Sequence, residues 1–158
     1  MSENDQIDQR IVDFLMEDGR MAAAEIARRI GGGLSERVVR YRIQRLINDK
    51  VIQIRPIVSP QAFGLNTRAD VVLEVESDAI MDVAQKAMGF DSVSYVACSI
   101  GETDVSIQVV AKDTAEIYQF VTEVIGKMPG VRKTTTSIVP IVLKDVYQWR
   151  IPRISLQE

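Results

Sequence analysis

The chain of 158 residues contains no histidine and a single cysteine, Cys98. One cysteine cannot form an internal disulfide, and with no histidine the chain lacks the ligand set of a structural zinc site. The missing histidine also removes the usual general base near neutral pH, so a serine or cysteine nucleophile would need an unusual activator. We therefore expect no enzyme activity, no metal site and no cofactor.

Long apolar runs and nucleotide-binding motifs are absent as well. No run approaches the roughly 20 apolar residues that a membrane helix needs, and the first ten residues are acidic and polar, unlike a secretory signal. We expect a cytoplasmic protein with no membrane partner. Gly31–Gly33 resemble part of a phosphate loop, but no strand precedes these glycines and no Gly-Lys-Ser/Thr sequence follows them.

The sequence does contain a basic segment inside an acidic protein. The formal net charge is −3, yet residues 20–55 carry nine cationic side chains against three acidic ones. The nine are Arg20, Arg28, Arg29, Arg37, Arg40, Arg42, Arg45, Lys50 and Arg55. The regions on both sides, residues 1–19 and 56–158, are acidic. Cations gathered in one short segment are typical of an element that binds a polyanion.

Apolar periodicity predicts three helices within the first fifty residues. A first helix over residues 6–18 is indicated by a stripe of Ile7, Ile11, Phe14 and Leu15. A second, shorter stripe ends at Gly31 and consists of Ala23, Ile26, Ala27 and Ile30. Ser35 is a favoured N-cap for a third helix, whose buried stripe is Val39, Ile43, Leu46 and Ile47. Three helices with a tight link between the last two are typical of a helix-turn-helix.

The third helix directs its polar residues away from that stripe. At about 100° per residue, the face opposite Val39, Ile43 and Leu46 carries Arg37, Tyr41, Gln44 and Arg45, with Val38 and Arg40 flanking them. Arginine forks suit phosphate oxygens and guanine edges, and a helix N-terminus offers N–H groups to a phosphate. A solvated helix face is the alternative interpretation. The candidate DNA-binding residues are Ser35, Glu36, Arg37, Arg40, Tyr41, Gln44 and Arg45.

The periodicity changes after the third helix. Residues 51–60 are strand-like, and turn-rich residues follow, so a winged helix-turn-helix domain is predicted over residues 1–60. Strands and helices then alternate in the order βαββαβ, with the hairpin turn Gly101–Asp104 between the second and third strands. This order predicts an α+β ferredoxin-like sandwich over residues 61–145, followed by a C-terminal tail, residues 146–158.

Several landmarks occur together and in order: "EDGR", "AAAEIARRI", "LSERVVRYRIQRL" followed by "VI", "FG", "GETD" and "MPGVRKTTTSIV". With these landmarks the chain resembles the Lrp/AsnC (feast/famine) family of transcription regulators over roughly residues 5–145. The resemblance implies sequence-specific binding to double-stranded DNA, with the second domain responding to an amino acid or related small metabolite. It also implies homodimers that stack into octamers, each a tetramer of dimers. Three glycines, Gly31 to Gly33, stand where the family usually has one.

The resemblance also implies where an effector binds. In the family, the turn that matches Gly101–Asp104 lies between dimers and contacts the effector, and Asp104 is a carboxylate suited to an α-amino group. The implied effector residues are Cys98, Ser99, Gly101, Glu102, Thr103, Asp104, Thr134, Thr135 and Thr136. From spacing alone, the turn reads as an ordinary hairpin. A metabolite-binding or interaction module without DNA binding is the alternative function.

Overall fold

The computed structural model describes residues 3–152 and divides the chain into two compact units. The first unit contains the residues up to Ile57 together with those from Lys144 onward, and the second spans Val58–Leu143. The described part of the predicted tail, residues 146–152, therefore belongs to the same unit as the N-terminal helices. No helix in the described residues is long and apolar enough to cross a membrane.

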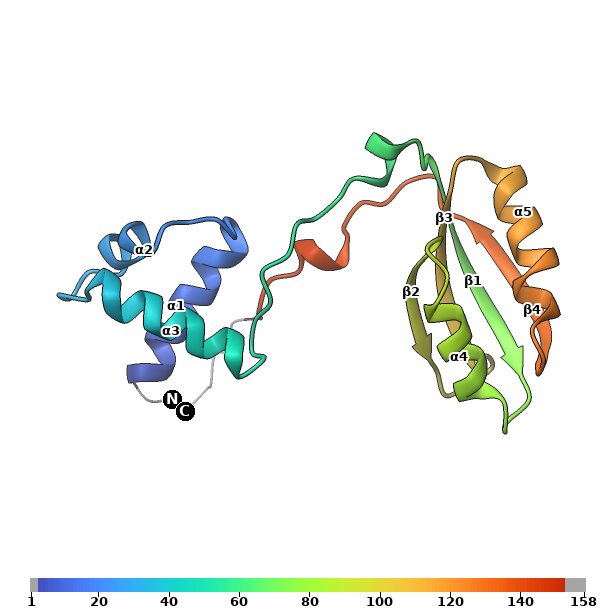
Figure 1. Cartoon of the computed structure of the whole chain (residues 1–158), viewed down its shortest axis with the longest axis horizontal. Helices are drawn as coiled ribbons and strands as arrows, with labels where there is room; N and C mark the ends of the chain where they lie inside the picture. Colours follow the sequence, from blue (N-terminus) through green and yellow to red (C-terminus); the bar gives the residue numbers. More distant parts are fainter. Residues whose placement is uncertain (1–2, 153–158) are drawn as a thin grey trace. The chain divides into compact units, whose positions relative to one another are not determined.

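Three helices form the first unit: α1 (Glu3–Glu17), α2 (Ala23–Ile30) and α3 (Glu36–Asn48) (Figure 1). They pack around Ile11, Ile26 and Val39, one from each helix, whose side chains are fully buried. The Oγ of Ser35 accepts a hydrogen bond from the Val38 N–H at 3.3 Å, which confirms the predicted N-cap of α3. The three predicted helices are confirmed.

The strand predicted over residues 51–60 is wrong. Residues 52–59 form no strand, and a short 3₁₀ helix, η1 (Pro60–Phe63), follows them. A strand needs a neighbour for its N–H and C=O groups, and within the described residues this segment pairs with no strand of the sheet. Its β-branched side chains Ile54, Ile57 and Val58 are exposed.

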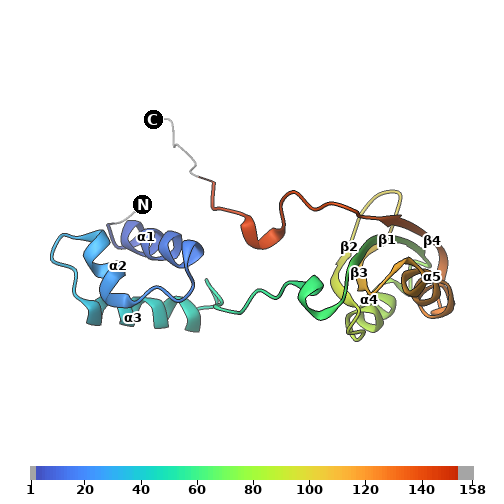
Figure 2. The same ribbon diagram turned by 90° about the horizontal axis from the view of Figure 1, so that it is seen from above.

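The second unit has the predicted βαββαβ order. Its elements are β1 (Thr67–Val75), α4 (Ile80–Met88), β2 (Val93–Cys98), β3 (Val105–Ala111), α5 (Thr114–Glu123) and β4 (Val131–Ile138). The strands pair antiparallel in the order β2-β3-β1-β4. Both helices lie on the same side of the sheet (Figure 2). The α+β ferredoxin-like prediction is confirmed.

Short 3₁₀ helices complete the fold. Within the second unit, η2 (Ile125–Lys127) follows α5, and in the first unit η3 (Val146–Gln148) lies in the C-terminal segment. A capping box closes η3, in which Asp145 and Gln148 bond each other's backbone.

Alternation along the strands builds the core of the second unit. The side chains of Ala69, Val71, Leu73 and Val75 on β1 are buried in the cluster that includes residues of α4 and α5. The other face of the sheet is more polar: Gln108 donates to Asp70 at 2.9 Å, and Lys133 pairs with Glu74 at 2.8 Å. The bond to Glu74 raises the pKa of the Lys133 ammonium. Antiparallel sheets tolerate one such solvated face.

Candidate DNA interface and effector region

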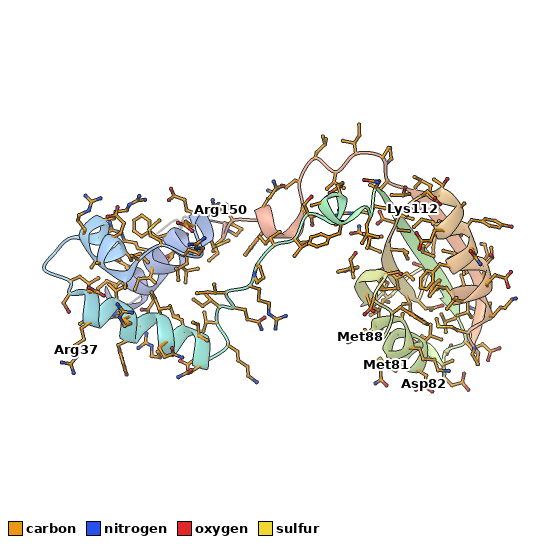
Figure 3. The ribbon with its side chains drawn as sticks, turned by 45° about the horizontal axis from the view of Figure 1, so that its top comes forward. Arg37, Met81, Asp82, Met88, Lys112 and Arg150 are labelled. Carbon is orange, nitrogen blue, oxygen red and sulfur yellow. The ribbon has the colours of Figure 1, made fainter. Side chains whose placement is uncertain are left out.

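The outer face of α3 carries four exposed polar side chains. Arg37, Arg40, Tyr41 and Gln44 are all exposed, and Tyr41 keeps 68% of its surface. Figure 3 shows Arg37 pointing away from the helices of the first unit. This face agrees with the helical periodicity, with Arg37 and Arg40 in the first turn of α3 and Tyr41 directly after Arg40.

Local contacts engage some of these residues. Glu36 forms an ion pair with Arg40, and Gln44 donates to Asn48 at 2.9 Å. The Ser35 hydroxyl is occupied by the N-cap bond. Arg37 forms no ion pair with any other described residue and is fully available to a ligand. Among the predicted residues, Arg37 and Tyr41 therefore present the most accessible chemistry.

Arg45 lies at the margin of this face rather than at its centre. Its guanidinium forms an ion pair with Asp8 of α1, and 42% of its side chain is exposed. Arg42 binds the other carboxylate oxygen of Asp8 at 2.9 Å and is only 13% exposed. Sequence reasoning missed Asp8 and the role of Arg42. The helical position of Arg42 indicates a buried role, because Arg42 lies on the flank of the Val39 stripe and cannot reach solvent freely.

The cations of α2 are held by an acid on the same helix. Glu25 accepts from Arg28 at 2.8 and 2.6 Å and from Arg29 at 2.7 Å. These bonds, first from Arg28 and then from Arg29, lower the pKa of Glu25 to about 2. Arg29 also stacks over Phe14, with its guanidinium carbon 5.5 Å from the ring centroid. These contacts partly neutralise the basic charge on α2.

The three glycines form the link between α2 and α3. Gly31, Gly32 and Gly33 have φ values of 72°, 67° and 76°, in the region that favours glycine. Leu34 closes the turn by donating to the Gly31 carbonyl at 3.3 Å. The extra glycines thus supply backbone conformations that other residues adopt with strain.

In the predicted effector region, Asp104 has a structural partner. Its carboxylate accepts from the Val75 N–H at 2.7 Å, and Arg132 lies 3.9 Å from the same oxygen. The Asp104 carbonyl accepts from the Ser99 N–H at 2.8 Å, and the Asp104 N–H donates to the Leu73 carbonyl at 3.0 Å. Asp104 therefore fastens the hairpin to the end of β1 beside the bulge between Glu74 and Val75.

The other predicted effector residues do not converge within one chain. Cys98 ends β2, Ser99 follows it, and both lie at one edge of the sheet, whereas Thr134–Thr136 lie on β4 at the other edge. Three strand spacings separate these edges, about 14 Å. Thr134 and Thr136 also face the opposite side from Thr135, because neighbours in a strand alternate. The turn residues Gly101, Glu102 and Thr103 complete the hairpin near Asp104, and Gly101 has a φ of 143°.

A hollow of about 220 Å³ lies elsewhere in the second unit, between α5 and the strands. It contains none of the predicted effector residues. Its two carboxylates are already used, since Glu116 accepts from the Lys112 N–H at 2.7 Å and Glu123 pairs with Lys127. Within the described part of the chain, no group of three or more carboxylate or cysteine side chains is placed to hold a metal ion.

Both units match known domains. Residues 5–47 match the AsnC-type helix-turn-helix domain, and residues 69–148 match the Lrp/AsnC ligand binding domain. The chain belongs to the Lrp/AsnC family. An HTH-type transcriptional regulator of Pyrococcus furiosus is 31% identical over 151 residues, which cover 95% of this chain and 98% of that protein. A regulator of Pyrococcus horikoshii is 33% identical over 96% of this chain and 93% of its own length.

Solved structures share the fold. AsnC of E. coli aligns with a TM-score of 0.80 at 20% identity, covering 93% of this chain and 99% of AsnC. A transcriptional regulator of Neisseria meningitidis, solved in complex with L-Met, aligns with a TM-score of 0.82 at 24% identity over 92% and 93% of the two chains. The domains and relatives make this Lrp/AsnC member an HTH-type transcriptional regulator with a ligand-binding domain.

Proposed function

We propose that this protein regulates transcription by sequence-specific binding of α3 in the major groove of double-stranded DNA. The observation that carries the proposal is the exposed face of α3, where Arg37 points away from the unit and has no ion pair within the described residues. Tyr41, four residues further along the helix, is also exposed. An α-helix fits the major groove, and a guanidinium donates two hydrogen bonds to the O6 and N7 of guanine. The N-terminal residues of a recognition helix are those that reach base edges.

Replacement of Arg37 tests this proposal. Arg37→Ala should weaken binding to the cognate site by about 1–3 kcal/mol if the side chain reads a base, and should relax the preference at that base pair. A phosphate contact would instead weaken binding to all sequences about equally and reduce the salt slope by about one unit. Mobility-shift titrations on the upstream region of the protein's own coding sequence and on a scrambled duplex distinguish the two.

Lys112→Ala is the matched control, because it removes one exposed cation from the second unit (Figure 3). Its binding should equal that of the parent chain. Unchanged DNA affinity in Arg37→Ala would contradict the role of α3. A parent chain that shifts no DNA but binds a small molecule would instead favour the alternative function, a metabolite-binding module without DNA binding.

We further propose that an amino acid or a related metabolite binds near the Gly101–Asp104 turn. One oxygen of Asp104 bonds Val75, so the carboxylate retains capacity for an α-amino group. The L-Met complex of the Neisseria regulator supports an amino acid as the effector class. Because Cys98 and Ser99 lie about 14 Å from Thr134–Thr136 within one chain, an amino acid that contacts both groups needs a second copy of the chain to bring them together.

Asp104→Asn tests this site more sharply than alanine. An amide oxygen can still accept from the Val75 N–H, while the negative charge that attracts an ammonium group is lost. A thermal-shift screen of the twenty amino acids, L-Met included, should give a shift with the parent chain that Asp104→Asn loses. Asp91→Asn, with the same charge change on an exposed loop, should keep the shift. Retention of the shift in Asp104→Asn would show that the effector binds at another site.

We propose that the working form is a homodimer, and that dimers assemble into an octamer. Two features support pairing of chains: the separation of the effector residues, and the segment of residues 52–59, which forms neither helix nor strand and carries exposed apolar side chains. A two-fold dimer would present two copies of α3 to successive turns of the major groove, about 34–36 Å apart.

A further inference from the structure

One carboxylate on α1 binds two arginines of the proposed recognition helix. Asp8 Oδ1 accepts from Arg42 Nη1 at 2.9 Å, and Asp8 Oδ2 pairs with Arg45 Nη2. The Asp8 side chain is 15% exposed, so this contact is largely shielded from solvent. Surface ion pairs contribute little, but shielded pairs with two bonds to one carboxylate are more strongly held.

The arginines of α3 therefore differ in freedom. Arg37 and Arg40 lie on the outer face, and Arg40 remains 73% exposed despite its bond to Glu36. Arg42 and Arg45, three residues apart on the flank that faces α1, are turned toward Asp8. Arg45 still exposes 42% of its side chain, so it lies close to solvent, but Asp8 holds its guanidinium against α1.

The same turn of α1 also holds α2. Arg10, two residues after Asp8, donates to the carbonyls of Arg29 and Ile30, each at 3.2 Å. A cation at these carbonyls satisfies the C-terminal end of α2. The turn of α1 that carries Asp8 and Arg10 thus contacts both helices of the helix-turn-helix, and one of the two cations that link Asp8 to α3, Arg45, lies at the margin of the proposed DNA surface.

We propose that Asp8 is a positioning residue for DNA recognition. It holds Arg45 against α1, and so limits the non-specific attraction of α3 for phosphates while fixing the helix in one orientation on the groove. This role rests on the proposed DNA binding by α3. A freed Arg45 would add a phosphate contact, which carries no sequence information.

Asp8→Asn gives a result that a merely structural role would not give. The affinity for a random duplex should rise, and the slope of log affinity against log salt should steepen by about 0.9, one further phosphate contact. The ratio of cognate to random affinity should fall by roughly tenfold, within the range of one lost base contact. Fluorescence anisotropy across a salt series measures both quantities.

Three further variants isolate the contact. Asp13→Asn makes the same charge change on α1 at a residue with no ion pair in the described part of the chain, and should leave the ratio unchanged. Asp8→Glu keeps the carboxylate and should restore most of the discrimination. Asp8→Asn combined with Arg45→Gln should lose the steeper slope, because the freed cation is gone.

Equal effects of Asp8→Asn and Asp13→Asn would overturn the proposal, since bulk charge would then explain the change. A proportional loss of cognate and random binding in Asp8→Asn would also overturn it, because the role would then be structural only.

Thermal unfolding of the DNA-free chain separates failure of this proposal from failure of the proposed function. If Asp8 and Arg45 interact, the shift in Tm of the double variant Asp8→Asn/Arg45→Gln should be smaller than the sum of the two single shifts. Additive shifts would overturn the contact itself, whatever the DNA result. A parent chain that binds no DNA would contradict the proposed function, whereas the non-additive shifts would still be observed.

Discussion

The arginines of the first unit differ in the acidic residue that neutralises their charge. Arg28 and Arg29 share Glu25 on their own helix, Arg45 shares Asp8 on another helix, and Arg37 has no such acid among the described residues. The helix-turn-helix therefore presents fewer free cations than its composition suggests. A DNA phosphate or base that contacts Arg37 would therefore have no acidic partner to displace among the described residues.

Glu25 should make the stability of the first unit depend on pH in acid. Its pKa in the folded chain, about 2, lies below the ordinary 4.5, so its stabilisation is fully present above about pH 4.5. That stabilisation is lost as the pH falls through about 2. The Tm of the parent chain should therefore fall more steeply between pH 4.5 and pH 2 than the Tm of Glu25→Gln. Parallel curves in circular dichroism would contradict this prediction.

Periodicity predicted the exposure of Arg37, Tyr41 and Gln44, because a helical wheel depends only on neighbours within the helix. It also placed Arg45 on that face, whereas the structure puts Arg45 at its margin. It could not predict the partner of Arg45. Asp8 is 37 residues away in sequence, and only the packing of α1 against α3 brings the two together. For the same reason the bond between Asp104 and Val75, 29 residues apart, changes the interpretation of the predicted effector turn.

At the level of elements, the turn before β4 depends on one glycine. Gly130 has a φ of 89°, and its carbonyl accepts from the Glu76 N–H at 2.8 Å. A Cβ at this position would come within 2.3 Å of the Ala79 Cβ, at the start of α4. The loop that precedes α4 and the turn that precedes β4 therefore approach more closely than a side chain allows.

Gly130→Ala should destabilise the chain by about 2–4 kcal/mol, because backbone strain and a steric clash add. Gly64→Ala is the matched control: its φ is 79°, but no atom lies within 4 Å of the added Cβ. It should lose only about 1 kcal/mol, for the strained backbone alone. Urea unfolding of the intact chain measures both values. Equal losses would show that the loop before α4 moves to accommodate the methyl group.

The elements of the second unit follow the sequence pattern closely because their partners lie within the same chain. Helix α3 likewise begins where Ser35 predicts. The segment of residues 51–60 fails for the opposite reason: β-branched residues favour extended backbone, but a strand exists only beside another strand. Propensity alone therefore could not predict whether this segment pairs.

At the scale of the whole molecule, the acidic chain concentrates its cations in one unit and its candidate effector residues in the other. A coupling between the two requires that effector binding changes the arrangement of chains or the availability of α3, and the coupling must act equally in both directions. The two groups of effector residues lie at different edges of the sheet. We therefore expect effector binding to act on DNA binding by changing how copies of the chain assemble.

Hydroxyl-radical footprinting of the intact chain on its cognate DNA tests the central claim most directly, since it reports α3 in the groove and two copies per site together. The claim predicts two protected windows whose centres lie about 10–10.5 base pairs apart, or a multiple of that spacing. Arg37→Ala should weaken both windows together. A single protected window at saturation, or two windows that Arg37→Ala leaves unchanged, would contradict the account.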